Sequence, residues 1–441
     1  MALVSTVGAG SSAVAAPSAY FPYPVRVERL ENGFTVALVP FPSKGLVAYY
    51  TLVRVGSRNE VEVGHTGFAH LFEHMMFRGT KKVSADKRDE LTKTRGIDDT
   101  AWTYIDHTVY TLQGPSASLP TMIEIEADRF QNLWYAKDIF QTETKAVLGE
   151  YNKNFSNPAN KMDEVLSETI FKRHTYKHTT MGYLDDIKRM PEMYEYGQGF
   201  FKRFYRPDAC TLFVVGDFDA EKTLALIKLA YGGWGDKVER PKVVAEAEQD
   251  GERVKHVDWD KETKPRMFVA FRSAAMNGDF KDAAIQNLLF PLLFGPATPL
   301  YKDLVLDRQL VESIESWYID TIDPRFFPVL FTLKDASKFD EVKRTVFAAI
   351  ERAATGDGVS PKFFADVQSN ARYGLLMGLT SPAKVAEKLV WAATPTGDPA
   401  ALGPLYERIA GLTLADVKAY LAKHWVARNR TVVTLSTKAK K

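Results

Sequence analysis

Residues 65 to 80 read HTGFAHLFEHMMFRGT, an apolar run that favours a helix and contains two histidines and a glutamate. His70 and His74 are four residues apart, so on a helix they lie within roughly 40° of each other, as two ligands of one ion must. Glu73 directly precedes His74, where a carboxylate can reach a water held by the same ion and take its proton. The order H-x-x-E-H, the inverse of the commoner H-E-x-x-H, is one of the known catalytic zinc motifs.

A pattern of five residues also arises by chance, and histidines on an amphipathic helix are usually surface or satisfied core residues. Two carboxylates further along the chain bear on this choice. Glu143 and Glu150 are seven residues apart within a stretch, 121 to 152, that has helical periodicity, so both face the same way. Such a pair is by itself more often a solvated helix face than a site. Whether the motif marks a metal site therefore depends on the rest of the sequence.

The composition excludes several classes of protein. With 441 residues, 45% of them hydrophobic, the chain can bury more than one core, and two to three domains are expected. A formal charge of +2 gives no global field for nucleic acid or an anionic membrane. A single cysteine, Cys210, excludes an internal disulfide framework and a multi-cysteine zinc site. A bound metal would therefore be held by histidines and carboxylates.

The N-terminal segment bears on where the protein acts. Residues 13 to 16, Ala-Val-Ala-Ala, resemble a signal-peptidase site, although no basic residue precedes them. Residues 1–19 are therefore predicted to be the remnant of an export signal or a disordered start. A periplasmic or exported location is expected, with the cytoplasm as the alternative. No run approaches the roughly 18 to 20 apolar residues that span a bilayer, so no membrane span is expected.

The order of strand and helix signals predicts two mixed halves. Two β-prone segments, 25–30 and 34–39, flank Asn32-Gly33, the strongest short signal for a hairpin. Residues 46–55 and 100–111 each read as one strand. The charged run at 236–256 can bury little, which is typical of a linker. Residues 206–215 and 428–435 each place a strand after a helix, so the second half repeats the first in outline.

These motifs together resemble the pitrilysin and insulinase family of zinc peptidases, which includes mitochondrial processing peptidase. The resemblance rests on His70, Glu73 and His74, followed 76 residues after His74 by Glu150, with Glu143 seven residues before it. It extends to four further segments: Gly67-Phe68-Ala69, Phe77-Arg78-Gly79-Thr80, Glu126-Ala127-Asp128-Arg129 and Val214-Val215-Gly216-Asp217. This spacing is far more specific than the five-residue motif alone.

The resemblance implies an α+β fold of two related αβ-roll domains, each a mainly antiparallel sheet packed with helices. Residues 20–235 would form the N-terminal zinc-binding domain, residues 236–256 the linker, and residues 257–441 a C-terminal domain without the metal motif. His70, His74 and Glu150 would bind Zn²⁺, with a water in the fourth position.

Two carboxylates and one strand complete the implied site. Glu73 would be the general base, and Glu143 would orient a ligand or support the field of the site. The segment Thr100, Ala101, Trp102, Thr103 resembles the edge strand with which members of the family pair an extended peptide. The family often has asparagine at the position of Thr100, so one polar contact to the substrate is in doubt.

A second departure from the family pattern concerns an arginine and a tyrosine that hold the substrate in active members. The equivalent positions here are Val305 and Glu312, and neither can stabilise developing negative charge. The sequence therefore predicts a heterodimer in which a homologous subunit supplies the arginine and tyrosine. A different alignment, in which Arg308 or Tyr318 takes that role, is the alternative.

The predicted function is that of a zinc metalloendopeptidase acting on peptides or unfolded segments bound as an added strand. The alternative is a catalytically silent structural subunit with the same fold. Hydrolysis of a non-peptide substrate has no support, because the chain has neither a phosphate-binding loop nor a Gly-x-Ser-x-Gly motif.

Overall fold

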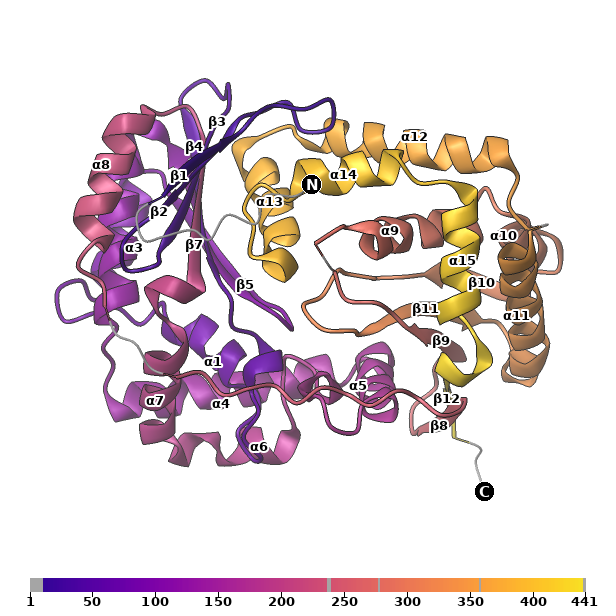
Figure 1. Ribbon diagram of the computed structural model, residues 1–441. Helices are drawn as coiled ribbons and strands as arrows, with labels where there is room; N and C mark the ends of the chain where they lie inside the picture. Colours follow the sequence, from indigo (N-terminus) through magenta and orange to yellow (C-terminus); the bar gives the residue numbers. More distant parts are fainter. Residues whose placement is uncertain (1–10, 236–238, 277, 357, 439–441) are drawn as a thin grey trace. The chain divides into compact units, whose positions relative to one another are not determined.

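The computed structural model describes residues 11–235, 239–276, 278–356 and 358–438, and the chain forms two compact units (Figure 1). Unit 1 combines the described residues up to Tyr151 with Thr180–Val243 and Met377–Gly403. Unit 2 combines Asn152–Thr179 with Val244–Leu376 and the described residues from Pro404 onward. Among the helices of these ranges, none is long and apolar enough to cross a membrane.

Unit 1 is built on a seven-stranded sheet in the order β1-β2-β3-β7-β4-β6-β5. The hairpin of β2 and β3 turns at Asn32-Gly33 as expected, with Gly33 in the left-handed region at a φ of 92°. The pair β3·β7 is parallel and the other neighbouring pairs are antiparallel, which leaves β5 at an edge. The strands are β1 (Ser12–Ala15), β2 (Val25–Arg29), β3 (Thr35–Pro40), β4 (Leu46–Val53), β5 (Asp98–Thr103), β6 (Thr108–Pro115) and β7 (Cys210–Gly216).

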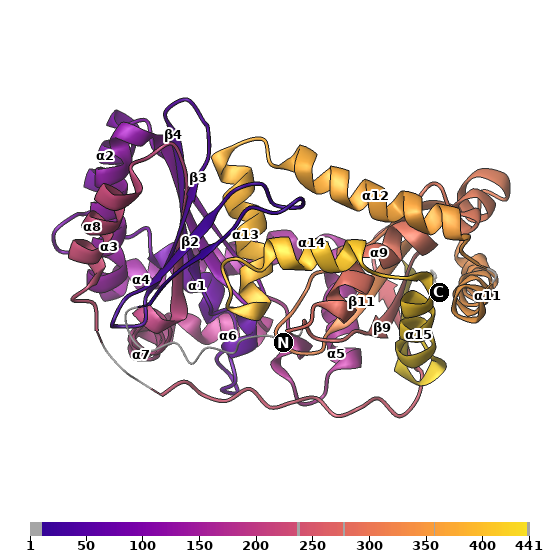
Figure 2. The same cartoon turned by 45° about the horizontal axis from the view of Figure 1, so that its top comes forward.

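Helices cover both faces of this sheet. Helices α3 and α8 lie on one face and α13 lies on the other (Figures 1 and 2). The helices of unit 1 are α1 (Phe68–Met75), α2 (Ala85–Thr94), α3 (Leu119–Asn132), α4 (Lys137–Asn154), α6 (Leu184–Arg189), α7 (Tyr194–Phe204), α8 (Ala220–Tyr231) and α13 (Pro382–Thr396).

Unit 2 is built on a five-stranded sheet in the order β10-β11-β9-β12-β8. Its strands are β8 (Arg253–Trp259), β9 (Arg266–Arg272), β10 (Val311–Glu315), β11 (Phe326–Leu333) and β12 (Arg430–Thr437). Buried side chains of α9, α11 and α15 share one apolar core with β9 and β11. The helices are α5 (Pro158–Ile170), α9 (Lys281–Leu293), α10 (Pro299–Tyr301), α11 (Phe339–Thr355), α12 (Pro361–Gly378), α14 (Leu402–Ala410) and α15 (Leu414–His424).

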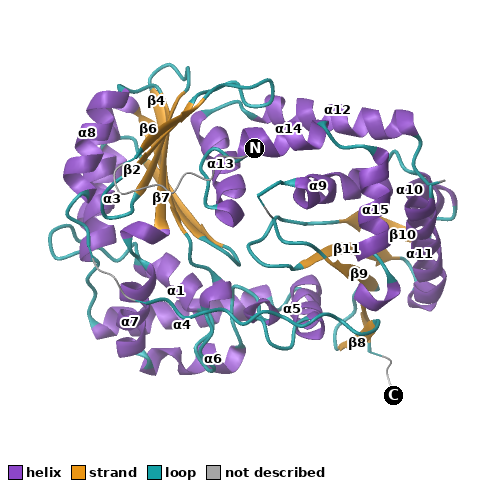
Figure 3. Ribbon diagram, viewed as in Figure 1, coloured by secondary structure: helices purple, strands orange, loops and turns teal. Residues whose placement is uncertain are grey.

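The two sheets repeat one topology. The order β3-β7-β4-β6-β5 of unit 1 reappears in unit 2 as β8-β12-β9-β11-β10. In each of these five-stranded orders, the first pair (β3 with β7, β8 with β12) is parallel and the other neighbouring pairs are antiparallel. Figure 3 shows helices packed against both sheets. The predicted fold class, two related α+β domains with mainly antiparallel sheets, is confirmed.

Each unit also takes one helix from the other half of the chain. Helix α5 lies within the first half of the chain, between α4 and α6, yet it packs on β8 and β12 of unit 2. Helix α13 belongs to the second half, yet it packs on β4 and β7 of unit 1. Each compact unit is therefore made of several separate segments of the chain, and its bounds differ from the ranges 20–235, 236–256 and 257–441. That the two halves are related as linear domains with those boundaries stays a prediction.

Three local expectations can be compared with the structure. The single strand expected over 100–111 is wrong, because the chain reverses there: β5 ends at Thr103 and β6 begins at Thr108. The stretch 121–152 forms two helices, α3 and α4, with a break between them. Of the predicted signal remnant or disordered start, residues 1–10 lie outside the described residues, whereas Ser12–Ala15 forms β1 and pairs with β2.

Candidate active site

Helix α1 carries the motif, and its two faces have different roles. Phe68, Leu71, Phe72 and Met75 recur at helical spacing and are fully buried, so they fix the helix against the core. The motif residues lie on the remaining surface. The helix begins at Gly67, which has a φ of 88°, and a side chain there would come 2.9 Å from the carbonyl oxygen of Met181.

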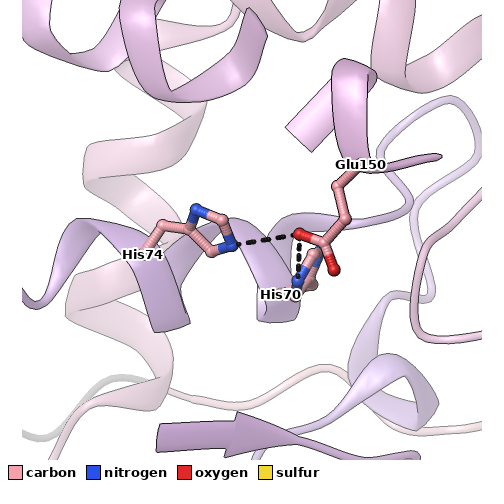
Figure 4. Close-up of side chains that lie close together, drawn as sticks. All are labelled: His70, His74 and Glu150. Carbon is pink, nitrogen blue, oxygen red and sulfur yellow. Dashed lines mark ion pairs between the residues drawn. The ribbon is translucent and has the colours of Figure 1, made fainter. Parts of the chain in front are cut away.

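The structure brings together the three predicted metal ligands. His70 and His74 extend from α1 toward Glu150 of α4 (Figure 4). Oε2 of Glu150 lies 3.5 Å from Nε2 of His70 and 3.5 Å from Nε2 of His74. One ligand atom of each residue lies within 4.8 Å of the others. Two helices far apart in sequence thus present two imidazoles and one carboxylate to a common point.

Glu143 lies on the same face of α4 and contacts His74 from the other side. Its Oε2 is 3.5 Å from Nδ1 of His74, and its Oε1 pairs with Nε of Arg78 at 3.0 Å. Burial acts to raise the pKa of Glu143, but His74 and Arg78 outweigh it, so the pKa is lowered. Glu143 is thus an ionised carboxylate that orients the His74 ring.

The two histidines differ in their surroundings. Burial lowers the pKa of His70 to about 4, and the neighbouring His74 acts in the same direction, so the His70 imidazole is neutral near pH 7. Nδ1 of His70 has no hydrogen-bond partner among the residues that the structure describes. The hydrogen bond with Glu143 raises the pKa of His74. Near pH 7, binding of a cation therefore competes with protonation of His74, whereas His70 is already neutral.

Glu73 lies between the metal ligands and the edge strand. Burial raises the pKa of Glu73, although the nearby hydroxyl and backbone N–H of Thr103 act to lower it. The raised pKa suits a group that must accept a proton and release it again. Glu73 therefore lies close to Thr103 of the edge strand.

The predicted substrate strand lies within β5, at the edge of the seven-stranded sheet of unit 1. It consists of Thr100, Ala101, Trp102 and Thr103. The N–H of Tyr104, just past the strand, donates to the carbonyl of His107 on the β6 side. Since N–H groups alternate along a strand, that of Ala101 points away from β6, toward the open edge. The indole N–H of Trp102 donates to His107 (3.2 Å), so this ring has a partner within the protein.

The two positions that the family resemblance assigns to the substrate-holding pair, Val305 and Glu312, lie in unit 2. Val305 lies in the π-helical turn Lys302–Asp307, and Glu312 lies on β10, where it pairs with Lys264. Of the alternatives, Arg308 is paired with Asp303 and Glu341, and the hydroxyl of Tyr318 donates to Asp320. Both alternative side chains already have partners within unit 2.

Comparison with known families accounts for this arrangement. The family described as Insulinase (Peptidase family M16) matches residues 35–183, and the family described as Peptidase M16 inactive domain matches residues 197–370. The chain belongs to peptidase family M16. All five predicted metal and catalytic residues lie within the first match. The resemblance to the pitrilysin and insulinase peptidases is confirmed.

Individual M16 proteins give the same result. The zinc protease PqqE of Helicobacter pylori is 26% identical over 365 residues, which are 81% of this chain and 80% of that protein. The crystal structure of a protease from Helicobacter pylori superposes with a TM-score of 0.87 at 24% identity, covering 96% of this chain and 100% of the other. Pitrilysin superposes with a TM-score of 0.78 at 21% identity, covering 98% of this chain and 47% of its own.

One residue that contacts the predicted site was missed by sequence reasoning. Arg78 pairs with Glu143 and was given no role, although it lies within a segment that carries the resemblance. A signal was present, because Arg78 follows His74 by four residues in a run that favours a helix, although α1 itself ends at Met75. What the spacing could not show is that α4 presents a carboxylate to Arg78.

Proposed function

We propose that this M16 chain is the zinc-binding subunit of an endopeptidase that hydrolyses peptides or unfolded segments. The observation that carries the proposal is the meeting of His70, His74 and Glu150 at one point, with Glu73 beside them. A structural scaffold has no physical need of this combination. The relatives named zinc proteases support the same chemistry.

The donor set fits a zinc ion. Two imidazole nitrogens and one carboxylate oxygen form one of the ligand sets of catalytic zinc, which leaves a fourth position for water or substrate. Ligands about 2.1 Å from a tetrahedral ion lie roughly 3.4 Å from one another. The Glu150 oxygen is 3.5 Å from each imidazole nitrogen, which agrees with such an arrangement.

In the proposed hydrolysis, Glu73 and Glu143 have different roles. When bound, zinc supplies a Lewis acid that polarises the scissile carbonyl and lowers the pKa of water. Glu73 accepts the proton of the attacking water and delivers it to the nitrogen of the leaving amine. Glu143 holds His74 in the orientation that binding requires.

The edge strand β5 supports recognition of an extended peptide. A peptide added antiparallel or parallel to β5 pairs with the outward N–H of Ala101, two residues before Thr103, which lies close to Glu73. Main-chain pairing of this kind selects the extended conformation more than the side chains. Peptides and unfolded segments are therefore the proposed substrates.

A homologous partner subunit is part of the proposal. Val305 and Glu312 leave this chain without the arginine and tyrosine, and Arg308 and Tyr318 are already paired. The chain also spans about half of pitrilysin, so a second chain of this fold would complete that length. We propose that the partner supplies the arginine and tyrosine. An exported or periplasmic location is proposed from Ala13 to Ala16 alone.

Two substitutions test the metal chemistry. Glu73→Gln is expected to retain about one zinc per chain and lose hydrolysis of an unstructured peptide, whereas His74→Ala is expected to lose the metal. Glu90→Gln, on the exposed surface of α2, is the matched control and is expected to change neither. Zinc content is measured by atomic absorption and cleavage by mass spectrometry. Full activity of Glu73→Gln would remove that residue from the mechanism.

The partner is tested by adding a second M16 chain that has the arginine and tyrosine. Cleavage is expected to rise at least tenfold with the partner, and to stay low when its arginine is replaced by alanine. A single chain that cleaves at full rate, with no gain from the partner, would refute the two-subunit proposal. A zinc-loaded pair that cleaves no peptide would favour the silent structural subunit instead.

A further inference from the structure

The N-terminus of the metal helix α1 is capped by a distant carboxylate. The N-cap residue Gly67 has no side chain to accept the free N–H groups of the first turn. Glu60 takes that role: Oε2 accepts the N–H of Gly67 at 2.9 Å and Oε1 accepts the N–H of Ala69 at 2.7 Å. Glu60 is only 3% exposed, so these two hydrogen bonds form in the protein interior.

This cap acts directly on one metal ligand. Helix α1 has only eight residues, and His70 is the third of them, directly after Ala69. A helix frays from its ends, so loss of the cap displaces His70 before His74, which lies in the second turn.

Glu60 is itself fixed to the loop that leaves the edge strand. It directly follows the 3₁₀ turn Ser57–Asn59, in which the N–H of Arg58 donates to the carbonyl of Ile105 at 2.8 Å. Gly56, just before the turn, packs so closely that a side chain would come 2.3 Å from the carbonyl oxygen of Tyr104. Tyr104 is the first residue after β5. One short segment thus links the strand to the metal helix.

A second contact holds the chain just before α1 without touching the helix N–H groups. The hydroxyl of Thr66 donates to Asp186 at 2.7 Å, and its backbone N–H donates to the same carboxylate oxygen. This contact keeps the segment in place if the cap is lost. A change at Glu60 should therefore loosen the first turn of α1 without unfolding unit 1.

We propose that Glu60 is a positioning residue for zinc binding, which holds His70 in register with the loop that leaves β5. The inference rests on the proposed zinc function. It assigns to Glu60 the placing of one ligand relative to the strand that receives the peptide, and no contact with substrate.

The test compares Glu60→Gln with Glu62→Gln in the full chain. Glu62 lies on the same segment but pairs with Arg203 and Tyr196, so it is the matched control. Zinc affinity is measured by competition with a chelating dye, and ligand geometry by the visible spectrum of the cobalt(II) form. Glu60→Gln is expected to weaken zinc binding roughly tenfold and to alter the cobalt spectrum, while Glu62→Gln changes neither. Glu60→Asp, which keeps the carboxyl group on a shorter side chain, is expected to fall between Glu60→Gln and the wild type.

Hydrogen exchange of the metal-free chain gives a readout that does not depend on zinc. Glu60→Gln is expected to speed exchange of the amides of Phe68, Ala69 and His70 and to leave α3 unchanged. Wild-type zinc affinity and wild-type exchange in Glu60→Gln, or equal losses in Glu62→Gln, would overturn the proposal. If the wild type binds no zinc, the proposed function fails, and the exchange result still decides whether Glu60 holds the helix. If Glu60→Gln does not fold, Glu60→Asp decides in the same measurements.

Discussion

Glu143 contributes to the site through His74 and does not belong to the set of three ligands. Replacing it by glutamine keeps the size of the side chain and removes the charge that orients the ring. We expect Glu143→Gln to lower zinc affinity or kcat/KM by about 10- to 100-fold, as is typical for partners of metal-bound histidines. Both quantities are measured, with Glu124→Gln, an exposed pair with Lys82, as the control. Wild-type values for both would remove Glu143 from the site.

The residues of the site divide into those that the sequence reveals and those that it does not. His70, Glu73 and His74 lie on one short helix, and Glu143 and Glu150 lie two turns apart on another, so helical spacing alone grouped each set. The joining of the two sets came from the family resemblance. Glu60 was not found, because its cap depends on how the segment before α1 folds back, which no periodic pattern encodes.

At the scale of elements, the open edge of β5 makes a prediction about peptide binding. Ala101→Pro removes an N–H that points away from β6, so the sheet keeps its hydrogen bonds. An added peptide strand loses one donor and meets the proline ring. Cleavage of an unstructured peptide, measured as kcat/KM, is expected to fall at least roughly tenfold.

Zinc content separates this effect from damage to the site. Ala101→Pro is expected to bind zinc as the wild type does, because the metal ligands come from α1 and α4. Ala101→Gly, which keeps the N–H, is the matched control and is expected to keep most of the activity. Normal cleavage by Ala101→Pro would exclude pairing at this residue.

Helix α15 of unit 2 carries a pH-dependent cap. The side chain of Thr413 accepts the N–H of Asp416, while Asp416 accepts the N–H of Thr413 and pairs with Lys281. Lys281, followed by Thr413, lowers the pKa of Asp416 to about 2. A pKa lowered by folding means that this carboxylate adds stability above its ordinary pKa near 4. That stability is lost as the pH falls from about 4 toward 2.

We therefore expect Asp416→Asn to destabilise α15 at pH 7 and not at pH 2. Allowing for solvent screening, the loss is about 0.5 kcal/mol. It is measured as the change in hydrogen-exchange protection of the α15 amides at pH 7, 4 and 3. Asp366→Asn, which breaks an exposed pair with Lys362 on α12, is the control and should show no such trend. An equal loss at pH 7 and pH 3 would contradict the assignment.

Elements were predictable where the signal is local. The hairpin of β2 and β3 followed from Asn32-Gly33, and β4 from its β-branched and aromatic run. The reversal between β5 and β6 was missed because Asp106 is the only residue of 104–107 that favours a turn, and β-prone residues surround it. There the hydrogen bond from Tyr104 to His107 closes the turn, and the close approach of Gly56, a tertiary contact, packs against it.

At the scale of the molecule, the exchange of α5 and α13 makes each unit depend on both halves of the chain. Val385, Leu389 and Val390 of α13 are fully buried in unit 1. A fragment of residues 1–243 lacks this helix and leaves the face of β4 and β7 uncovered. We expect this fragment to aggregate and to bind a hydrophobic dye.

The control for this fragment restores the missing helix. Residues 377–403, joined to residue 243 through a flexible linker, are expected to return a soluble product with less dye binding. Soluble yield and dye fluorescence are the measurements. A fragment of residues 1–243 that is monomeric and unfolds cooperatively would show that α13 is dispensable. Sequence patterns located the repeat but not the exchange, because a swapped helix has the same amphipathic pattern as one that stays with its own sheet.

The exchange of helices also affects how the protein is made. Strand β7 completes the sheet of unit 1 at Gly216, whereas α13 ends at Thr396. At roughly 5–20 residues per second, a ribosome takes on the order of 10 to 40 seconds to cover that interval. During this time the nascent sheet has an uncovered apolar face, which chaperones and aggregation can compete for. Substitutions that weaken the packing of α13 should therefore lower the yield of newly made protein before they lower the activity of the molecules that fold.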